Sequence, residues 1–317
     1  MHQLITLSNE TGMQVTVSNF GARLTSILFP TQNGLQEMLL TYQDPQDFKG
    51  DPFYLGTTCG RVANRIAGGQ FSIGTDVYLL SKNEESTCLH GGREGFSHRY
   101  WAVKTSNKNT VELALTSPDG DQGFPGEVSV TARFCLSDTN CLTLEYHATT
   151  TKACPINLTN HAYFNLGEED ISNLLLTLNA ECYLEKNANN LPTGKILPVK
   201  DTKFDFTSTR TLLTNTHLDN PVSGYDDCFV LDKTKTVAAE LISKRNEIKL
   251  QLMTNQPGIQ VYSGGFLSSP FKQGAGVCLE AQNFPNAINI SHFPNSVVLP
   301  AQVYYYTTQF QFTALSQ

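Results

Sequence analysis

Short stretches of alternating apolar and polar residues recur along this chain. Residues 13–18, 127–136 and 142–146 each carry an apolar side chain at every second position. This period of two is typical of a β-strand with one face in a core. The turn-forming residues 137–140, Ser-Asp-Thr-Asn, separate the last two stretches and predict a hairpin. Helical periodicity does not stand out anywhere, so the pattern indicates an all-β protein.

The alternation continues toward the end of the chain, at residues 248–253 and in the aromatic-rich segment 303–312. Many short strands with turn residues between them indicate a sandwich or a barrel, and the size of the chain favours large sheets that pack face to face. A chain of 317 residues is long enough for two average domains or for one large all-β domain. Because no linker or repeat divides it, we expect residues 1–317 to form a single β-sandwich domain.

Composition and charge disfavour several classes of protein. The net charge of −7 and the scattered Lys and Arg residues disfavour a nucleic acid or an anionic membrane as partner. No apolar stretch approaches the roughly 18–20 residues of a membrane helix, and we see no signal-peptide pattern. The eight cysteines show no C-x-x-C pair and no zinc-ligand spacing, which indicates reduced thiols. We expect a cytoplasmic protein with a small-molecule substrate, as a monomer or weak homodimer.

One stretch places a histidine among amides and hydroxyls. If residues 157–166 are extended, one face collects five polar residues: Asn157, Thr159, His161, Tyr163 and Asn165. On such a face, His161 is placed to meet a polar ligand rather than a core. The alternative is a half-buried histidine that is hydrogen-bonded for structural reasons.

A second two-faced stretch, residues 277–282, carries a glutamate. Val277, Leu279 and Ala281 point one way, whereas Glu280 shares the other face with a cysteine and a glutamine. Burying a carboxylate among apolar neighbours is costly without a partner, and it would raise the pKa toward that of a general base. The alternative is a glutamate on an exposed sheet face.

Two glycine-rich segments supply further polar groups. Asn64 and Arg65 put an amide beside a guanidinium fork, which suits vicinal hydroxyls. His90 precedes two glycines that let the backbone pass close to a ligand, and Trp101 could form an apolar wall for a sugar. The alternatives are a surface loop with a solvated arginine and a glycine-rich turn beside a core tryptophan.

Two more segments bear polar groups next to apolar runs. Asp226 and Asp227 are adjacent, so in a strand they point to opposite faces and would not share a proton. One of them could accept hydrogen bonds from ligand hydroxyls, although a turn-capping acid explains the same pattern. Gln260 lies on a strand pattern opposite to the apolar Ile259 and Val261.

Together these segments give a polyol-binding set with one base and one acid: Asn64, Arg65, His90, His161, Asp226, Gln260 and Glu280. Two histidines and two carboxylates could instead bind a cation. No pair has the tight H-x-H or H-x₃-H spacing that would support a metal site, so we expect none.

Five short stretches are more specific together than any one of them. They are residues 60–66 (GRVANRI), 89–92 (LHGG), 157–166 (NLTNHAYFNL), 257–262 (PGIQVY) and 279–285 (LEAQNFP). In these stretches, and in their order, the chain resembles the galactose mutarotase (aldose 1-epimerase) family over essentially its whole length. The resemblance implies a large antiparallel β-supersandwich with little helix. It also implies an isomerase that interconverts the α and β anomers of free hexoses such as galactose and glucose, with no metal and no organic cofactor.

The resemblance also implies roles for individual residues. By position, Glu280 matches the general base of the family and His161 its general acid. The groups that match the sugar-holding positions are Asn64, Arg65, His90, Asp226 and Gln260. After the matching aspartate the family often has His-Asn, whereas this chain has Asp227-Cys228.

The chemistry fits these groups. Anomerisation removes a proton from the C1 hydroxyl and delivers one to the ring oxygen, which a carboxylate and an imidazolium can do. We expect Glu280 to be ionised and His161 protonated at rest. Whether the two flank one site about a sugar ring apart, each within hydrogen-bond reach of its own oxygen, stays open at this point. Two alternatives stay open: a hexose-6-phosphate 1-epimerase, which should need a basic cluster, and a non-catalytic sugar-binding module on the same fold.

Overall fold

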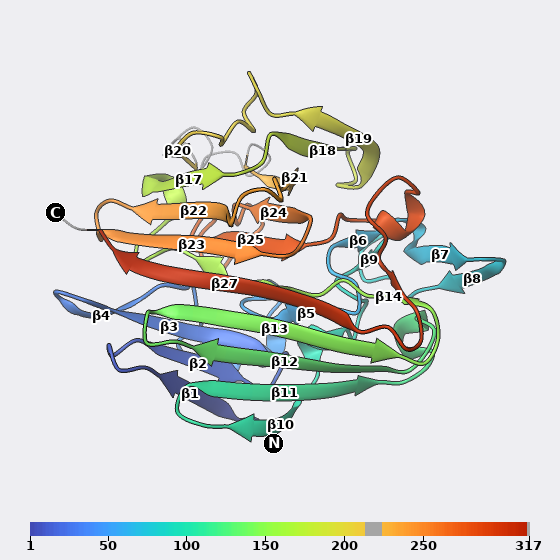
Figure 1. The fold of residues 1–317 in the computed structure, drawn as a ribbon, viewed down its shortest axis with the longest axis horizontal. Helices are drawn as coiled ribbons and strands as arrows, with labels where there is room; N and C mark the ends of the chain where they lie inside the picture. The colour runs from blue at the N-terminus through green and yellow to red at the C-terminus, as the bar shows by residue number, and fades with distance from the viewer. Residues whose placement is uncertain (213–223, 316–317) are drawn as a thin grey trace.

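The computed structural model describes residues 1–212 and 224–315, which form strands joined by loops and short 3₁₀ helices (Figure 1). The 3₁₀ helices are η1 (Asp47–Gly50), η2 (Ala67–Gly69), η3 (Phe96–His98), η4 (Asp121–Gly123), η5 (Ile171–Asn173) and η7 (Ala287–Asn289). Within the described ranges no helix is long and apolar enough to cross a membrane.

The largest sheet has nine strands, and its long strands cross most of the molecule in Figure 1. In spatial order they are β10 (Ala102–Ser106), β11 (Thr110–Ser117), β12 (Val128–Leu136), β13 (Cys141–Thr150), β27 (Tyr304–Ala314), β23 (Ile248–Thr254), β22 (Val237–Ser243), β17 (Leu174–Leu178) and β20 (Arg210–Thr211). The sequence-based strands at 127–136, 142–146, 248–253 and 303–312 are therefore confirmed.

The predicted hairpin between β12 and β13 shows how the alternation sets the register. Leu136 lies opposite Leu142, and the intervening turn is closed by the N–H of Ser137 donating to the carbonyl of Cys141 at 2.9 Å. Every second residue of both strands is buried, as the period of two requires. The hairpin is confirmed.

Two smaller sheets pack against the large one. The four-stranded sheet contains β1 (Leu4–Ser8), β2 (Gln14–Ser18), β3 (Arg23–Thr31) and β4 (Gly34–Glu37). The six-stranded sheet contains, in spatial order, β16 (Tyr163–Phe164), β25 (Val277–Gln282), β24 (Gly258–Tyr262), β21 (Asp226–Val230), β18 (Cys182–Lys186) and β19 (Pro192–Pro198). Two-stranded ladders complete the fold: β5 (Thr58–Cys59) with β15 (Thr159–Asn160), β6 (Arg65–Ile66) with β9 (Cys88–Leu89), β7 (Gln70–Ile73) with β8 (Asp76–Leu79), and β14 (Cys154–Pro155) with β26 (Val297–Val298).

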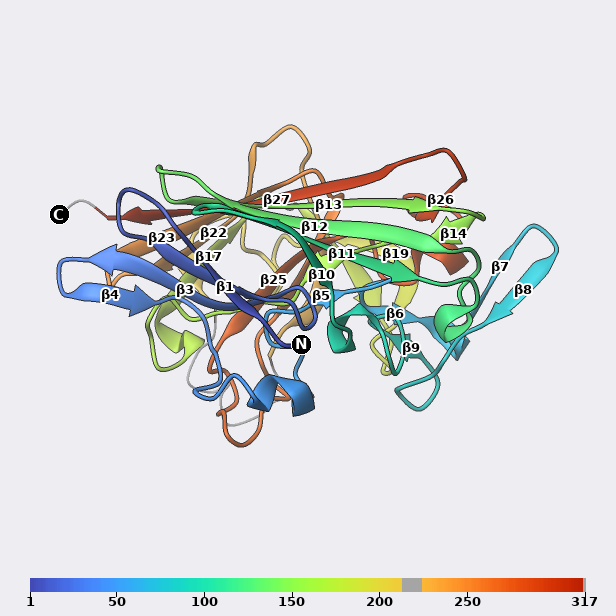
Figure 2. The ribbon, with the colours of Figure 1, turned by 90° about the horizontal axis from the view of Figure 1, so that it is seen from below.

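The sheets form a sandwich around one main core. Seen from below, the nine-stranded sheet is one layer, and β1, β3 and β25 lie beneath it (Figure 2). The main hydrophobic cluster joins all three sheets, with Val15 from the four-stranded sheet, Phe134 from the nine-stranded sheet and Leu279 from the six-stranded sheet. All ladders between the named strands are antiparallel, so the expected antiparallel β-sandwich with little helix is confirmed.

β25 positions the chemistry because its two faces differ. Val277, Leu279 and Ala281 pack into the main core, which directs Glu280 to the opposite face of the six-stranded sheet. Gln260 of β24 lies directly across from Glu280 in the ladder. The sheet therefore presents a row of polar side chains on the side away from the nine-stranded sheet.

Candidate active site

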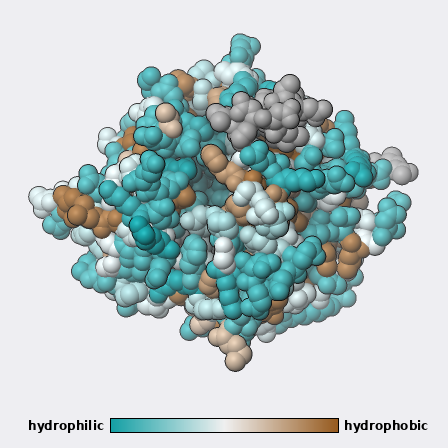
Figure 3. All heavy atoms as spheres, turned by 180° about the vertical axis from the view of Figure 1, so that it is seen from behind, coloured by the Kyte–Doolittle hydropathy of each residue, from teal (hydrophilic) through white to brown (hydrophobic). Residues whose placement is uncertain are grey.

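A cavity of about 330 Å³ lies over this polar row. Its lining comes from loops and strands far apart in sequence: Pro52, Phe53, Tyr54, Asn64, Arg65, Glu84, Leu89, His90, His161, Tyr163, Asn190, Asp226, Tyr262, Phe266 and Glu280. The face of the molecule seen in Figure 3 is hydrophilic over most of its area and hollowed near its centre. A concave site of this size, with aromatic walls and converging polar groups, suits a small polar ligand.

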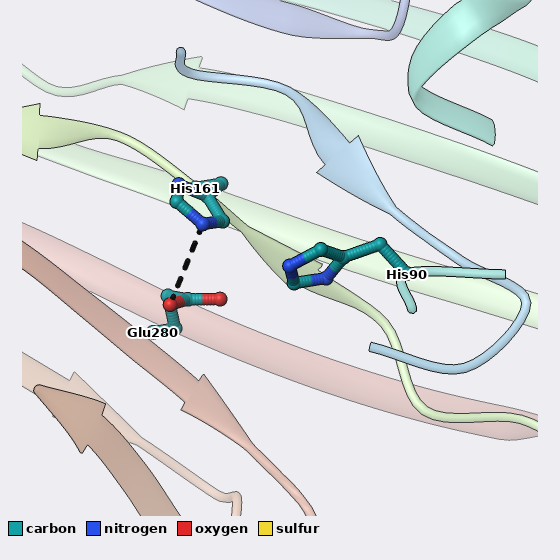
Figure 4. A group of neighbouring side chains, drawn as sticks. All are labelled: His90, His161 and Glu280. Carbon is teal, nitrogen blue, oxygen red and sulfur yellow. Dashed lines mark ion pairs between the residues drawn. The ribbon is translucent and has the colours of Figure 1, made fainter. Parts of the chain in front are cut away.

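His161 and Glu280 meet in this cavity (Figure 4). β16 pairs with β25, which brings the segment that carries His161 alongside the strand of Glu280. Nε2 of His161 lies 3.7 Å from Oε1 of Glu280, and the residues are 5% and 2% exposed. The C1 hydroxyl oxygen and the ring oxygen are bonded to the same carbon, so the groups that serve them must lie close together.

Burial shifts the pKa values of the two residues in opposite directions. It lowers the pKa of His161 to about 4, and burial followed by the charge of Asp226 raises the pKa of Glu280 well above its usual range. An ion pair would shift both pKa values the other way, but here burial is the larger effect. Burial therefore acts on both residues against the charged pair that was expected from the sequence.

The second ring nitrogen of His161 faces a thiol. Sγ of Cys278 lies 3.4 Å from Nδ1 of His161, and the cysteine is fully buried on the same face of β25 as Glu280. A thiol is a weak hydrogen-bond donor and a weak acceptor, so it leaves the imidazole free to gain or lose its proton at Nε2. This contact fixes the ring without committing it to one charge state.

His90 lies beside the pair, to the right of both residues in Figure 4. Both Asn64 and His90 have left-handed backbones, with φ of 60° and 50°, and the N–H of Asn64 donates to Nδ1 of His90 at 3.2 Å. Burial, together with the nearby His161 and Arg65, lowers the pKa of His90 well below its usual range. His90 is therefore neutral with its proton on Nε2, and it is a hydrogen-bond donor to whatever lies in the cavity.

The same three residues have the spacing of a possible cation site. One ligand atom from each of His90, His161 and Glu280 lies within 4.8 Å of the others. Nε2 of a neutral His90 carries the ring proton, because Nδ1 accepts the N–H of Asn64, and a protonated nitrogen cannot ligate a metal. This donor set fits substrate hydroxyls better than a cation. The expectation of no metal stays a prediction.

A polar array covers the adjacent wall. Nε and Nη2 of Arg65 donate to the two carboxylate oxygens of Glu84 at 2.8 and 2.9 Å, and Nη1 lies 3.8 Å from Asp226. Nε2 of Gln260 donates to the other oxygen of Asp226 at 2.6 Å. Gln260 does not line the main cavity. It lines a smaller one of about 20 Å³ beside it, so its contact with the site passes through Asp226.

Asp227 and Cys228, which stand where the family often has His-Asn, lie away from the main cavity. Oδ1 of Asp227 lies 3.1 Å from Nζ of Lys186, whose ammonium also donates to the carbonyl of Asp226 at 2.7 Å. The additional negative charge is thus paired on β18 rather than directed at the cavity. Cys228 is buried next to the smaller cavity.

Six of the seven residues singled out from the sequence line one cavity, and Gln260 adjoins it. Glu84 and Tyr54 also line it but carried no signal in the sequence, because loop folding brings them there. Tyr262, at the end of β24, lies in the matching stretch 257–262 but was not singled out as a site residue. Trp101 is buried in the core, and its indole N–H donates to the carbonyl of Phe96 at 3.2 Å, so of the two interpretations that the sequence left open the core tryptophan is the correct one.

Comparison with known proteins agrees with this geometry. The sequence model of the family described as aldose 1-epimerase matches residues 3–311. The chain belongs to the aldose 1-epimerase family. It is 36% identical to an aldose 1-epimerase of Escherichia coli (strain K12), covering 99% of this chain and 96% of that one. It is 34% identical to a galactose mutarotase of Homo sapiens, covering 95% and 91%.

Solved structures of aldose 1-epimerase relatives have the same fold. A GalM/aldose epimerase homologue from C. elegans superposes with a TM-score of 0.94 at 29% identity over 100% of both chains. A galactose 1-epimerase from Lactobacillus acidophilus NCFM gives 0.87 at 30% identity over 98% of this chain and 94% of that one. As an aldose 1-epimerase the chain is an isomerase, a mutarotase that interconverts the anomers of an aldose.

Proposed function

We propose that this chain interconverts the α and β anomers of free hexoses such as galactose and glucose, with Glu280 as base and His161 as acid. The observation that carries the assignment is the 3.7 Å separation of Oε1 of Glu280 and Nε2 of His161 in the buried end of the cavity. Within the described part of the chain, Oε2 of Glu280 has no hydrogen-bond partner, so a C1 hydroxyl can donate to it.

The proposed reaction conserves protons. The Glu280 carboxylate takes the proton of the C1 hydroxyl while the His161 imidazolium gives its proton to the ring oxygen. The bond between C1 and the ring oxygen breaks, and an aldehyde forms. Rotation about the C1–C2 bond and closure, with the two residues in exchanged roles, give the other anomer.

The pKa shifts bear on the energetics of this step. Before ring opening the reactive pair is ionised, and afterwards Glu280 is protonated and His161 neutral. Burial favours the second state, since it raises the pKa of Glu280 and lowers that of His161. The cavity therefore stabilises the protonation state that the pair has when the open-chain sugar is bound. Sugar hydroxyls and Arg65 must stabilise the carboxylate when the closed ring binds.

The remaining polar groups are proposed to hold the sugar. His90 is a neutral donor beside the catalytic pair, and Asn64 and Arg65 line the neighbouring wall. Asp226 can accept from sugar hydroxyls, with Gln260 fixing its carboxylate. Two carboxylates already engage the guanidinium of Arg65, Glu84 directly and Asp226 at 3.8 Å, which leaves this cation poorly suited to a phosphate. Free sugars are thus preferred over hexose 6-phosphates.

The test is polarimetry on freshly dissolved α-D-galactose, α-D-glucose and glucose 6-phosphate. We expect acceleration with both free sugars and a much lower rate with the phosphate. Equal or faster conversion of glucose 6-phosphate would favour the hexose-6-phosphate epimerase instead.

Three further expectations belong to this proposal. Residues 1–317 form one domain, supported by a hydrophobic cluster that runs from Leu7 to Phe312. The protein is cytoplasmic, supported by eight free cysteines, all of them in described positions. It acts as a monomer or weak homodimer, without nucleic acid or membrane.

A further inference from the structure

The two ring nitrogens of His161 have different neighbours. Nε2 faces Glu280 (Figure 4), whereas Nδ1 lies 3.4 Å from Sγ of Cys278. Cys278 is fully buried behind the ring, and it is not among the residues that line the cavity. It therefore does not touch a bound sugar, and it can act on the reaction only through the imidazole of His161.

The surroundings of Cys278 leave its sulfur available as a hydrogen-bond acceptor. Burial, followed by the charge of Glu280, raises the pKa of Cys278 well above its usual range, so the thiol is neutral. Tyr163 lies directly opposite Cys278 in the ladder between β16 and β25, but its hydroxyl donates to the carbonyl of Phe53 at 2.9 Å. Because a hydroxyl has one proton to donate, Tyr163 does not compete with His161 for the sulfur lone pairs.

The proposed reaction requires one particular tautomer of His161. The imidazolium gives the proton on Nε2 to the ring oxygen, so the proton that remains on the neutral ring is on Nδ1. The lone pair of Nε2 then takes a proton back when the sugar closes. Transfer of a proton from Glu280 to the same lone pair also gives the ionised pair that opens the ring. A neutral ring protonated at Nε2 could accept no proton there.

We infer that Cys278 is a positioning residue: its sulfur accepts the Nδ1–H of His161 and holds the imidazole in the tautomer whose Nε2 can accept and return a proton. The inference rests on the proposed function. In the opposite arrangement the thiol donates to Nδ1, and the ring proton is then on Nε2. The two arrangements differ in the position of one proton, which can be observed.

The tautomer is measured by ¹⁵N NMR of the histidine rings of the wild type, with the His161 signals assigned by their loss in His161→Ala. Burial lowers the pKa of His161 to about 4, so the ring is neutral at pH 8. We expect the ring proton of His161 on Nδ1 at this pH. A ring proton on Nε2 would overturn the inference, and this result does not depend on any activity.

The kinetic test uses Cys278→Ala and Cys278→Ser, which leave similar space behind the ring and differ by one hydroxyl. We expect kcat for galactose to fall about five- to tenfold in the Ala variant, the scale of one lost hydrogen bond, with KM unchanged because the cavity lining is intact. The Ser variant should recover part of the loss and keep the proton on Nδ1. The control is Cys154→Ala, a fully buried thiol that lies 3.6 Å from Nη1 of Arg61 instead, and kcat should not change.

A kcat at the wild-type value in Cys278→Ala would overturn the inference, and so would equal losses in the Ala and Ser variants. A wild type that does not accelerate mutarotation would overturn the proposed function instead, and the NMR measurement would still show which ring nitrogen of His161 carries the proton.

Discussion

Glu84 accepts two hydrogen bonds from Arg65, at 2.8 and 2.9 Å, and so fixes the guanidinium fork at the cavity wall. Glu84→Gln replaces one acceptor oxygen by a donor and breaks this two-point contact. We expect KM for galactose to rise about three- to tenfold, with kcat nearly unchanged, since roughly 1 kcal/mol of positioning is lost while the acid and base stay in place. Steady-state polarimetry measures both constants. A fall in kcat without a change in KM would contradict this role. Glu185→Gln, which disturbs an exposed pair with Lys195, is the control.

The pH profile should reflect the pair rather than either residue alone. The pair is active while it holds one proton. Burial lowers the pKa of His161 to about 4 and raises that of Glu280, so the profile of kcat/KM should be bell-shaped with a broad maximum around neutral pH. Polarimetry from pH 4 to 9, corrected for spontaneous mutarotation, measures it. Glu84→Gln should keep the shape. A single rise centred on the ordinary histidine value, about 6.5, would speak against the coupled pair.

Glu280→Gln should stabilise the fold while it removes activity. The pKa of Glu280 is raised in the folded state, so folding stability falls as pH rises from the unfolded pKa toward the folded one. The neutral amide avoids this loss. We expect Tm to rise by about 2–4 °C at pH 7.5 and by less at pH 5. Differential scanning calorimetry tests it, with the exposed Glu127→Gln as a control that should not shift Tm at either pH. A larger gain at pH 5 would refute the sign of the shift.

We expect Lys186 to stabilise the fold through its ion pair with Asp227. Lys186→Met leaves the buried Asp227 carboxylate without its cation, and we expect a loss of about 2–3 kcal/mol in the free energy of unfolding. Urea unfolding measures the loss. Adding Asp227→Asn should recover most of it, since the uncompensated charge is then gone. Lys195→Met, at an exposed pair, should stay within about 0.5 kcal/mol. Equal losses in the single and double variants would show that the ion pair is not the cause.

The alternation of residue types predicts a strand well where regular strands pair with it on both sides. β12 and β13 follow it because each has a partner on both sides over most of its length. Residues 157–166 do not form one strand. The chain pairs first with β5 and then with β25, and between them the N–H of His161 donates to the carbonyl of Thr57 at 2.9 Å. The change of partner directs His161 into the cavity.

The residues proposed as acid and base could be singled out from the sequence, but their electrostatics could not. Glu280 and His161 stand out as polar residues on two-faced stretches, which is a local property. The pKa shifts depend on how completely the loops exclude water from the cavity, and the pairing of Arg65 with Glu84 depends on where two loops meet. Neither is encoded in a short pattern of residue types.

The most direct test of the account is the rate of mutarotation of freshly dissolved α-D-galactose by Glu280→Gln and His161→Ala, measured by polarimetry beside the wild type. Loss of the base or the acid should lower kcat by about 10²–10⁴-fold, the usual scale of general acid–base catalysis, in protein that remains folded. A rate near that of the wild type for folded Glu280→Gln would contradict the assignment of Glu280 as the base.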